Sequence, residues 1–350
     1  MEIVNVDESE KWNRIVRSFP KWDVYYLNEY AYSLKLHGDG LPLLVYSTEE
    51  EFRICYVVMQ EDIAASEFFQ GVLPINTYYD WSTPYGYGGP LIDGQPTENA
   101  LCGFIRKLNR WCEEHSIVTQ FFRFHPLLQN QKLLENICEV VYMKKTIYID
   151  TRDEETIFRN MTPNNRNMVR KAEKNGVKIV MDHGERIKDF QRIYQKTMEN
   201  NHAEEYYFFE DEYFEYLKTH LAKNILFAYA VYGDKIVSAS IFLYNAQYIH
   251  YHLSGTLPEY RNLGATNLLL TKVAYWAAER GLEAFHLGGG VGITDSLLTF
   301  KKHFNRNGEI DFCIGRNIFD QNAFDKLVQL RLDMDPMFDM ARPFLIKYRG

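Results

Sequence analysis

Residues 226–290 carry the clearest structural signal of the chain, in the order LFAYAVYGDKIVSASIFLYNAQYIHYHLSGTLPEYRNLGATNLLLTKVAYWAAERGLEAFHLGGG. β-Branched and aromatic residues flank the Gly233-Asp234 turn, which predicts a β-hairpin, and apolar residues later recur at helical spacing up to Gly281. The pattern predicts three strands, a turn, a helix and a further strand, at residues 226–232, 236–244, 247–254, 257–264, 266–280 and 284–287. Three antiparallel strands followed by one helical crossover predict an α+β layer order.

The residues before this segment predict a helix with clear signals at both ends. Thr162 is suited to the N-cap, Pro163 to the first helical position, and Gly176 to the position after the last turn. A short strand and two helices are then predicted at residues 177–180, 187–199 and 210–221.

The first half of the chain reads as a second α+β region. Strands are predicted at residues 43–46, 52–59, 118–124 and 140–149, and a helix at residues 98–115. Residues 78–94 are rich in Gly and Pro, which argues against a regular helix or a central strand there. We place a domain boundary in the charged residues 150–155, which gives an N-terminal domain, 1–152, and a C-terminal domain, 153–350, with a helical tail.

Composition and charge limit the classes of function. The chain has 350 residues, 46% of them hydrophobic, and a net charge of −8, so we expect a soluble globular protein without general affinity for DNA. Five cysteines without a C-x-x-C pair indicate neither a disulfide framework nor a zinc site. The chain has no apolar run long enough to span a bilayer and no secretory signal at its start, so we expect a cytoplasmic protein without a transmembrane segment.

The turn Tyr260-Arg261-Asn262-Leu263-Gly264-Ala265 lies between a predicted strand and a predicted helix. Such a junction directs free backbone N–H groups and the positive helix end at one point, which suits a pyrophosphate, and Arg261 adds a charge. The alternative is that Gly264 only allows the chain to turn into the helix.

Four motifs occur together in one order: Tyr251-His252-Leu253-Ser254-Gly255-Thr256, the turn just described, Leu287-Gly288-Gly289-Gly290, and Phe300-Lys301-Lys302-His303-Phe304. This set resembles the second domain of the Fem-type peptidyltransferases, which belong to the Gcn5-related N-acyltransferase superfamily. The similarity is strongest over residues 162–304. It extends more loosely to residues 25–149, where Tyr85-Gly86-Tyr87-Gly88-Gly89-Pro90 resembles the substrate-cleft loop of the family.

The resemblance implies two tandem acyltransferase domains, with the acyl acceptor in a cleft between them and the donor on the second domain. In coenzyme A users of the superfamily, the turn that matches Arg261, Gly264 and Ala265 holds the donor pyrophosphate. Residues 256–259 depart from the fuller form of that motif. The Fem-type enzymes instead use aminoacyl-tRNA and a peptidoglycan precursor, so both donors remain open.

Lys301 is the first catalytic candidate. Helical spacing places it with Phe300 and Phe304 on one stripe and leaves Lys302 pointing elsewhere. By resemblance, Lys301 lies near the reacting groups, where a cation could bind phosphate or stabilise an oxyanion, and Phe300 lies near the substrate. The alternative is a solvated lysine pair on an amphipathic helix.

His252 is the second catalytic candidate, because it matches the family pattern and imidazole can accept a proton from an attacking ammonium. A packed, hydrogen-bonded histidine is the more common role on a strand. His250 and His252 also suggest a metal, but the sequence places no third ligand, so we expect none.

Further candidates concern substrate binding. Arg166 and Arg170 lie one helical turn apart on a basic face that suits a diphosphate or a tRNA end, although a merely solubilising face is the alternative. Tyr207 lies in an aromatic segment that could line a binding site or belong to the core. Tyr85 and Tyr87 follow from the resemblance of their loop.

The sequence therefore predicts an N-acyltransferase that moves an acyl group from acyl-coenzyme A to a primary amine by direct attack. The amine acceptor would be a small molecule or a lipid-linked or nucleotide-linked cell-envelope precursor. One alternative is a Fem-type transferase that takes an amino acid from aminoacyl-tRNA. Another is a binding domain that has the fold without the chemistry.

Overall fold

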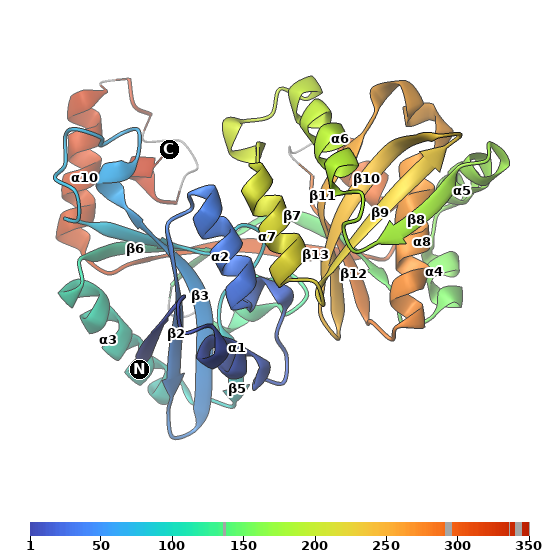
Figure 1. Cartoon of the computed structure of the whole chain (residues 1–350). Coiled ribbons are helices and arrows are strands. Elements are labelled where there is room, and N and C mark those ends of the chain that lie inside the picture. Colours follow the sequence, from blue (N-terminus) through green and yellow to red (C-terminus); the bar gives the residue numbers. More distant parts are fainter. Residues whose placement is uncertain (136–137, 291–295, 336, 340–344, 350) are drawn as a thin grey trace. The chain divides into compact units, whose positions relative to one another are not determined.

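The computed structural model describes residues 1–135, 138–290, 296–335, 337–339 and 345–349 (Figure 1). The chain divides into two compact units, one formed by Met1–Met143 with Phe312–Gly350 and the other by Lys144–Asp311. This division differs from the expected domains 1–152 and 153–350 in two ways. It falls earlier in the chain, within a strand, and it assigns the tail to the first unit. The tail could not be assigned from local sequence, because its partners are distant in the chain.

The second unit follows the expected order of elements, with one additional helix, α4. Its elements are β7 (Glu139–Asp150), which begins in the first unit, α4 (Glu154–Asn160), α5 (Pro163–Lys174), β8 (Lys178–Asp182), α6 (Ile187–Asn200), α7 (Asp211–His220), β9 (Ile225–Tyr232), β10 (Lys235–Tyr244), β11 (Tyr248–Thr256), α8 (Ala265–Glu279), β12 (Ala284–Gly288) and α9 (Ser296–Lys302). Thr162 caps α5 through its side chain, and Pro163 is its first residue, as the sequence predicts.

The strands of the second unit lie in the order β7-β12-β11-β10-β9-β8. Neighbours are antiparallel except β11 and β12, which are parallel and joined by α8. This arrangement confirms the α+β class and the single late crossover expected from the sequence.

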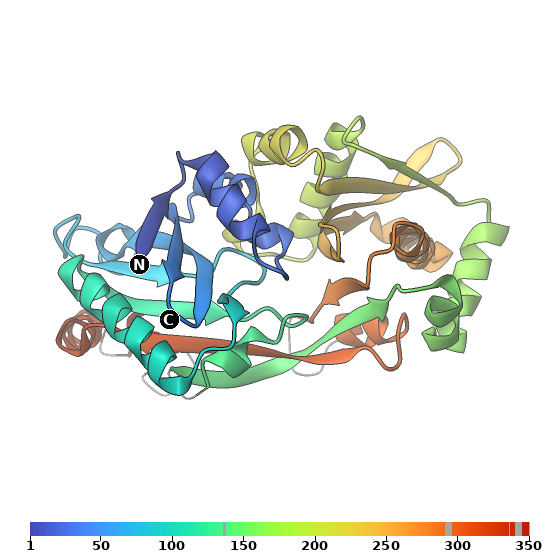
Figure 2. The same ribbon diagram turned by 90° about the horizontal axis from the view of Figure 1, so that it is seen from below.

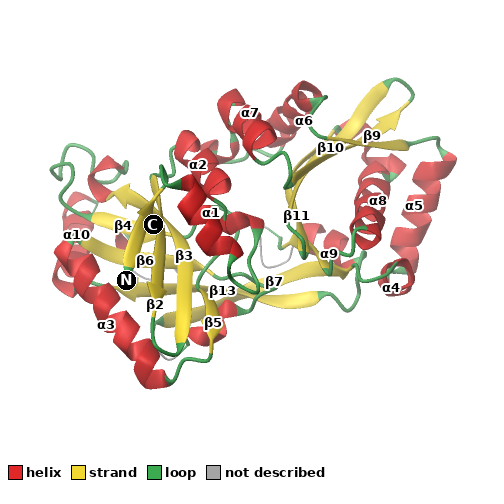
Figure 3. Ribbon diagram, turned by 60° about the horizontal axis from the view of Figure 1, so that its bottom comes forward, coloured by secondary structure: helices red, strands yellow, loops and turns green. Residues whose placement is uncertain are grey.

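Helices cover both faces of this sheet. Figures 1 and 3 show α5 and α8 on one side of β8–β11 and α6 and α7 on the other, and Figure 2 gives the same view from below. α8 is buried on more than one side, because its inner face packs on the sheet and α5 covers part of its outer face. This burial explains why most of residues 268–274 are apolar, although Lys272 among them is exposed.

The first unit is a second α+β layer structure. Its elements are β1 (Glu2–Asn5), α1 (Ser9–Arg17), α2 (Asn28–His37), β2 (Leu41–Thr48), β3 (Phe52–Asp62), β4 (Tyr79–Ser82), β5 (Leu91–Gly94), α3 (Glu98–Glu114), β6 (Ile117–Arg123), β13 (Glu309–Ile318), which begins in the second unit, and α10 (Gln321–Met334). The strand order is β1-β2-β3-β4-β6-β13, and β5 pairs with the first part of β3.

The Gly- and Pro-rich residues 78–94 contain two strands that the sequence analysis did not predict. β4 lies inside the sheet, antiparallel to β3 and parallel to β6, and β5 lies at the far end of the segment. The expectation that this segment holds no central strand is therefore wrong for its first residues. All of the prolines and glycines except Gly94 occupy residues 84–90, between the two strands, and Gly94 is the last residue of β5, so neither ladder is interrupted.

A buried carboxylate ties the tail into the first unit. Asp80 of β4 is 2% exposed and accepts hydrogen bonds from the Thr119 and Tyr348 hydroxyls at 2.7 Å each. Nε of Arg349 donates to the same carboxylate at 2.7 Å, and Nη1 of Arg349 donates to Glu61 at 2.6 Å. A buried charge needs such partners, so the tail completes the polar interior of this unit.

None of the helices in the described part of the chain has the length and apolar character required to cross a membrane.

Candidate functional site

β11 and β12 run side by side for only part of their length. They share three residue pairs, from Tyr248 with Ala284 to His250 with His286. β11 then continues to Thr256, paired on its other side with β10. The second half of β11 therefore has one edge without a strand partner among the described residues. Backbone N–H and C=O groups on such an edge can bind an extended ligand as a strand would.

β11 also contains a β-bulge at this place. Ile241 of β10 lies opposite Leu253, and Phe242 lies opposite Tyr251, so His252 is the extra residue. A bulge of this kind changes the direction of a side chain relative to the regular alternation, and bulges are frequent beside functional sites.

The side chain of His252 lies against α7. Its Nε2 atom is 2.9 Å from the hydroxyl of Tyr213, a residue that is 1% exposed. Burial, together with the neighbouring His250, lowers the pKa of His252 to about 3. The imidazole is therefore neutral at neutral pH and a weak proton acceptor, because an efficient general base has a pKa near the working pH. This geometry favours the packed, hydrogen-bonded role for His252.

α8 begins beside the last residue of β11, because the hydroxyls of Thr266 and Thr256 are 3.0 Å apart. Its N-cap is Gly264, and no side chain caps the first turn. The first backbone N–H groups of the helix therefore have no capping side chain as an acceptor and can donate to a ligand. The positive end of the helix dipole also lies here. Arg261, in the turn before the helix, is exposed. A helix start of this kind is able to bind an anion, and the binding role expected for Arg261, Gly264 and Ala265 stays a prediction.

The structure gives Gly264 a packing role as well. Its φ angle is +73°, in the left-handed region, and a Cβ atom there would lie 2.6 Å from the carbonyl oxygen of Met168 in α5. The turn and α5 therefore approach so closely that only glycine fits. Gly264 and Ala265 are both buried, so this part of the turn packs against the rest of the unit and not against solvent.

Lys301 and Lys302 have different environments despite being neighbours. Lys301 is 6% exposed, its Nζ donates to the carbonyl of Gly289 at 2.6 Å, and it lies 5.9 Å from the ring centroid of Tyr251. Lys302 is half-exposed and pairs with Glu309 at 2.6 Å. Of these two neighbours, it is Lys301 whose Nζ reaches the end of β12.

A second lysine reaches the same strand end, and the sequence analysis did not identify it. Nζ of Lys144 in β7 donates to the carbonyl of Gly290 at 2.5 Å, one residue beyond the carbonyl that Lys301 binds. A Cβ on Gly289 would approach the Lys144 side chain to 3.3 Å. No local pattern marks Lys144, because its approach depends on the pairing of β7 with β12.

The basic residues of α5 divide between two environments. Arg166 is half-buried and lies 4.8 Å from the ring centroid of Phe158 in α4. Arg170 is exposed, as are Lys171 and Lys174. The helix side that includes Asn165 packs against α8, where Asn165 accepts a hydrogen bond from Asn267 at 2.6 Å. Arg170 and the lysines therefore present positive charge to solvent, whereas Arg166 packs on an aromatic ring.

Two further candidates belong to the second unit. Phe300 packs against Phe304 at 5.2 Å between ring centroids, at the edge of the core of the second unit. Tyr207 lies in a short 3₁₀ turn, and its carbonyl accepts a hydrogen bond from Tyr194 at 2.9 Å.

Tyr85 and Tyr87 belong to the first unit, whereas every other candidate belongs to the second. The loop between them is held through its backbone, because the carbonyls of Tyr85 and Gly86 accept hydrogen bonds from Tyr30 at 2.6 Å and Arg123 at 3.2 Å. The ring of Tyr87 packs against rings of the same unit, those of Tyr25, His125 and Phe312. Burial raises the pKa of the Tyr87 hydroxyl, so this hydroxyl stays protonated.

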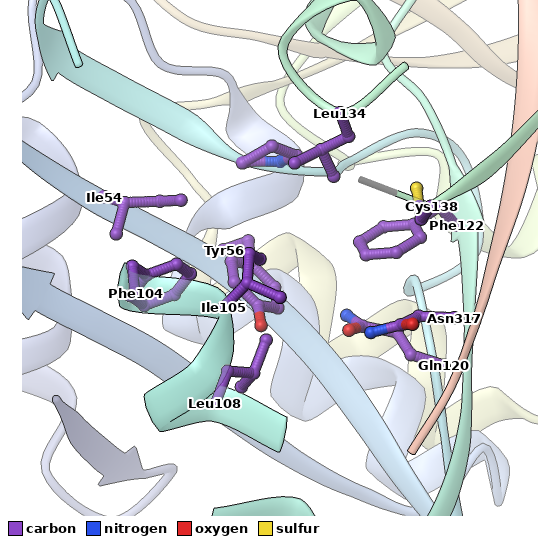
Figure 4. Close-up of a pocket in the computed structure, with 11 residues that line it drawn as sticks. Ile54, Tyr56, Phe104, Ile105, Leu108, Gln120, Phe122, Leu134, Cys138 and Asn317 are labelled. Atoms are coloured by element: carbon purple, nitrogen blue, oxygen red, sulfur yellow. The ribbon is translucent and has the colours of Figure 1, made fainter. Parts of the chain in front are cut away.

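The first unit contains a separate small pocket of about 20 Å³, open in part to solvent, between α3 and the sheet (Figure 4). It is lined mainly by apolar side chains and shares no residue with the corner between β11, β12 and α8.

Comparison with known protein families identifies the second unit. Residues 159–301 match the family model described as an acetyltransferase (GNAT) domain. These residues run from the end of α4 to Lys301 and include the bulged strand, the turn at Gly264 and α8. A search of curated proteins found no match to the chain. The second unit is therefore a domain of the GNAT superfamily, as the motif pattern of the sequence indicated.

Solved structures extend the similarity to both units. A crystal structure of FemX is 14% identical, with a TM-score of 0.65, and the match covers 93% of this chain and 99% of that one. The structure of L-PGS from Bacillus licheniformis is 13% identical, with a TM-score of 0.57 over 95% and 99%. A tandem GNAT protein from the clavulanic acid biosynthesis pathway is 7% identical, with a TM-score of 0.50 over 91% and 98%. At these identities the matches establish the tandem GNAT-like fold.

A comparison with Gly281 separates two effects of a substitution at Gly264 on stability: the crowding against α5 and the strain of the left-handed backbone. Gly281 has nearly the same φ, +72°, but a Cβ there meets nothing within 4 Å. We expect Gly281→Ala to cost about 1–2 kcal/mol from the left-handed backbone alone. Gly264→Ala should cost a further 1–3 kcal/mol, roughly, because it also pushes against α5. Urea unfolding of both variants measures this difference, and equal losses would contradict the close approach.

The environment of His252 predicts a pH effect on stability. The folded pKa is about 3 and the ordinary value is 6.5, so the unfolded chain takes up a proton that the folded chain does not. This contribution is fully present above pH 6.5 and is lost as the pH falls toward 3. The variant His252→Gln should therefore show a shallower decrease in unfolding free energy between pH 6.5 and 4. The same substitution at the exposed His183 is the control, and parallel profiles for wild type and His252→Gln would refute the prediction.

Proposed function

We propose that the protein is an N-acyltransferase that moves an acyl group from acyl-coenzyme A to a primary amine. The observation that carries this proposal is the corner where the end of β11, a strand with one edge that lacks a strand partner among the described residues, meets the uncapped start of α8. The helix start suits the diphosphate of the donor, and the strand edge suits the amide groups of its extended arm. The start of α8 and the edge of β11 thus offer neighbouring sites for the diphosphate and the amide-containing arm of the donor.

The reaction proceeds by direct attack in this proposal. The amine nitrogen bonds to the thioester carbonyl carbon, the C–S bond breaks, and the thiolate leaves and takes up the proton that the ammonium loses. The second unit, residues 144–311, contains no cysteine that could carry the acyl group. Lys301 is the group we assign to the developing oxyanion, since it is a buried cation beside the end of β12.

Aminoacyl-tRNA is the second candidate donor, and one observation favours it. Arg170, Lys171 and Lys174 expose positive charge along α5, which could contact a phosphate backbone. The net charge of the chain is −8, however, so tRNA would receive no general attraction. A cell-envelope precursor as the amine acceptor rests on the resemblance to Fem-type enzymes.

Calorimetric titration distinguishes the two donors. Coenzyme A should bind the wild-type protein, and Arg261→Glu should weaken it about tenfold or more, because the new carboxylate faces the diphosphate. Lys174→Glu, which makes the same charge change on α5, should leave coenzyme A binding unchanged. The reverse pattern, with aminoacyl-tRNA binding and sensitivity at Lys174, would replace acyl-coenzyme A by the second candidate.

The two neighbouring lysines test the catalytic assignment. Lys301→Ala should lower kcat about 10²-fold with a smaller change in KM, because a charge that acts mainly in the transition state is lost. Lys302→Ala removes the same charge from a half-exposed ion pair and should change kcat little. Lys301→Arg should restore part of the activity. Release of the free thiol from acetyl-coenzyme A with a panel of amines gives the rates.

Equal effects of the two alanine variants would remove Lys301 from the mechanism. A control unfolding curve for Lys301→Ala shows whether the folded fraction is unchanged. If no amine supports turnover although coenzyme A binds, the protein is a binding domain with this fold.

A further inference from the structure

Lys144 and Lys301 bind one short piece of backbone from two different elements. Nζ of Lys144, in β7, donates to the carbonyl of Gly290 at 2.5 Å. Nζ of Lys301, in α9, donates to the carbonyl of Gly289 at 2.6 Å. These two carbonyls are consecutive in the chain and come directly after the last residue of β12. The two side chains therefore hold the same segment from two sides.

This segment lies where the ladder between β7 and β12 ends. The register shifts between His286 and Gly288, and the last pair of the ladder is Gly288 with Ile147. Gly290 comes after this pair and is buried. A buried carbonyl needs a hydrogen-bond donor, and the side chain of Lys144 supplies one beyond the end of the ladder.

Alternation along β7 separates Lys144 from its neighbour Lys145. Side chains two residues apart lie on the same face of a strand, so Lys144 shares a face with Thr146 and Lys145 lies on the other. A Cβ atom on Gly289 would be 3.3 Å from Cε of Lys144 and 3.4 Å from Cγ2 of Thr146. Lys145 instead pairs with Asp311 of β13 at 2.5 Å. Only the face that includes Lys144 therefore packs on the end of β12.

The bond from Lys144 restricts the backbone to which Lys301 is attached. Residues 288–290 are three consecutive glycines, and glycine has the widest choice of backbone conformations. The carbonyls that the two lysines bind belong to consecutive peptide groups, which meet at the Cα atom of Gly290. When Lys144 fixes the second of these groups, the first has less freedom to rotate. The position of the carbonyl that Lys301 binds is then fixed as well.

We propose that Lys144 is a positioning residue for the acyl transfer. It holds the backbone at Gly290, and through this backbone it places the ammonium group of Lys301 where the oxyanion develops. The inference rests on the proposed function, in which Lys301 stabilises that oxyanion. Lys144 acts through Lys301 and is assigned no contact with the substrate. A displacement of about 1 Å at a reacting centre is enough to lower a rate strongly.

The variant Lys144→Met tests this role, because it keeps the length of the side chain and removes the ammonium group. We expect kcat to fall about tenfold with little change in KM for acetyl-coenzyme A. Lys145→Met, on the other face of β7, is the matched control and should keep the kcat of the wild type. Lys144→Arg can donate to the same carbonyl and should restore part of the rate.

A double-mutant cycle separates positioning from a general loss of stability. In the Lys301→Ala background, Lys144→Met should change kcat by less than about twofold, because the group that Lys144 positions is absent. A tenfold loss in both backgrounds would show that Lys144 acts independently of Lys301. An unchanged kcat for Lys144→Met alone would show that it has no role in the reaction. Either result overturns the proposal.

Nuclear magnetic resonance of the full chain tests the positioning without any turnover. The side-chain Cε signal of Lys301 should shift in Lys144→Met and stay unchanged in Lys145→Met. An unchanged Lys301 signal in both variants would contradict the inference. If no amine supports turnover, the proposed function fails, whereas this measurement still decides whether Lys144 positions Lys301. If Lys144→Met does not fold, the shorter, uncharged Lys144→Gln takes its place in both experiments.

Discussion

The close approach of Gly264 to the carbonyl of Met168 determines where α8 begins. Because no side chain intervenes, α5 can cover α8, and α8 can in turn pack on the sheet with two buried faces. The first turn of α8 also lies beside the end of β11, where the hydroxyls of Thr266 and Thr256 are 3.0 Å apart. A feature that serves packing thus also produces the polar corner on which the proposed function rests. Gly264 therefore contributes both to the stability of the fold and to the proposed binding site.

The end of β12 also contains a glycine with a left-handed backbone. β12 leaves its antiparallel register with β7 after His286, and Gly288 has a φ angle of +74°. Lys144 and Lys301 then bind consecutive carbonyls at Gly290 and Gly289. The hydrogen bond from Nζ of Lys301 to Gly289 fixes the position of this buried side chain, whereas the half-exposed Lys302 pairs with a carboxylate.

Local signals account for the elements that the sequence predicted well. The cap at Thr162, the Gly233-Asp234 turn and the helical spacing before Gly281 each depend on residues close in the chain, and the order of elements around residues 226–290 followed from them. The orientation of Lys301 also followed from helical spacing. The internal strand β4, the extra residue at His252 and the position of Lys144 did not, because each depends on the register with a distant strand. The pocket between α3 and β3 was missed for the same reason.

The contribution of Phe312–Gly350 to the first unit has a consequence for synthesis on the ribosome. The second unit is a continuous segment, so all of its contacts are available once residue 311 has emerged. The first unit begins earlier but must wait for β13, α10 and the bonds from Tyr348 and Arg349 to Asp80. Until then β6 keeps an edge without β13, and Asp80 lacks two of its donors. The half of the protein that is made first is thus the half that finishes folding last, and for that interval the open edge of β6 can pair with other chains.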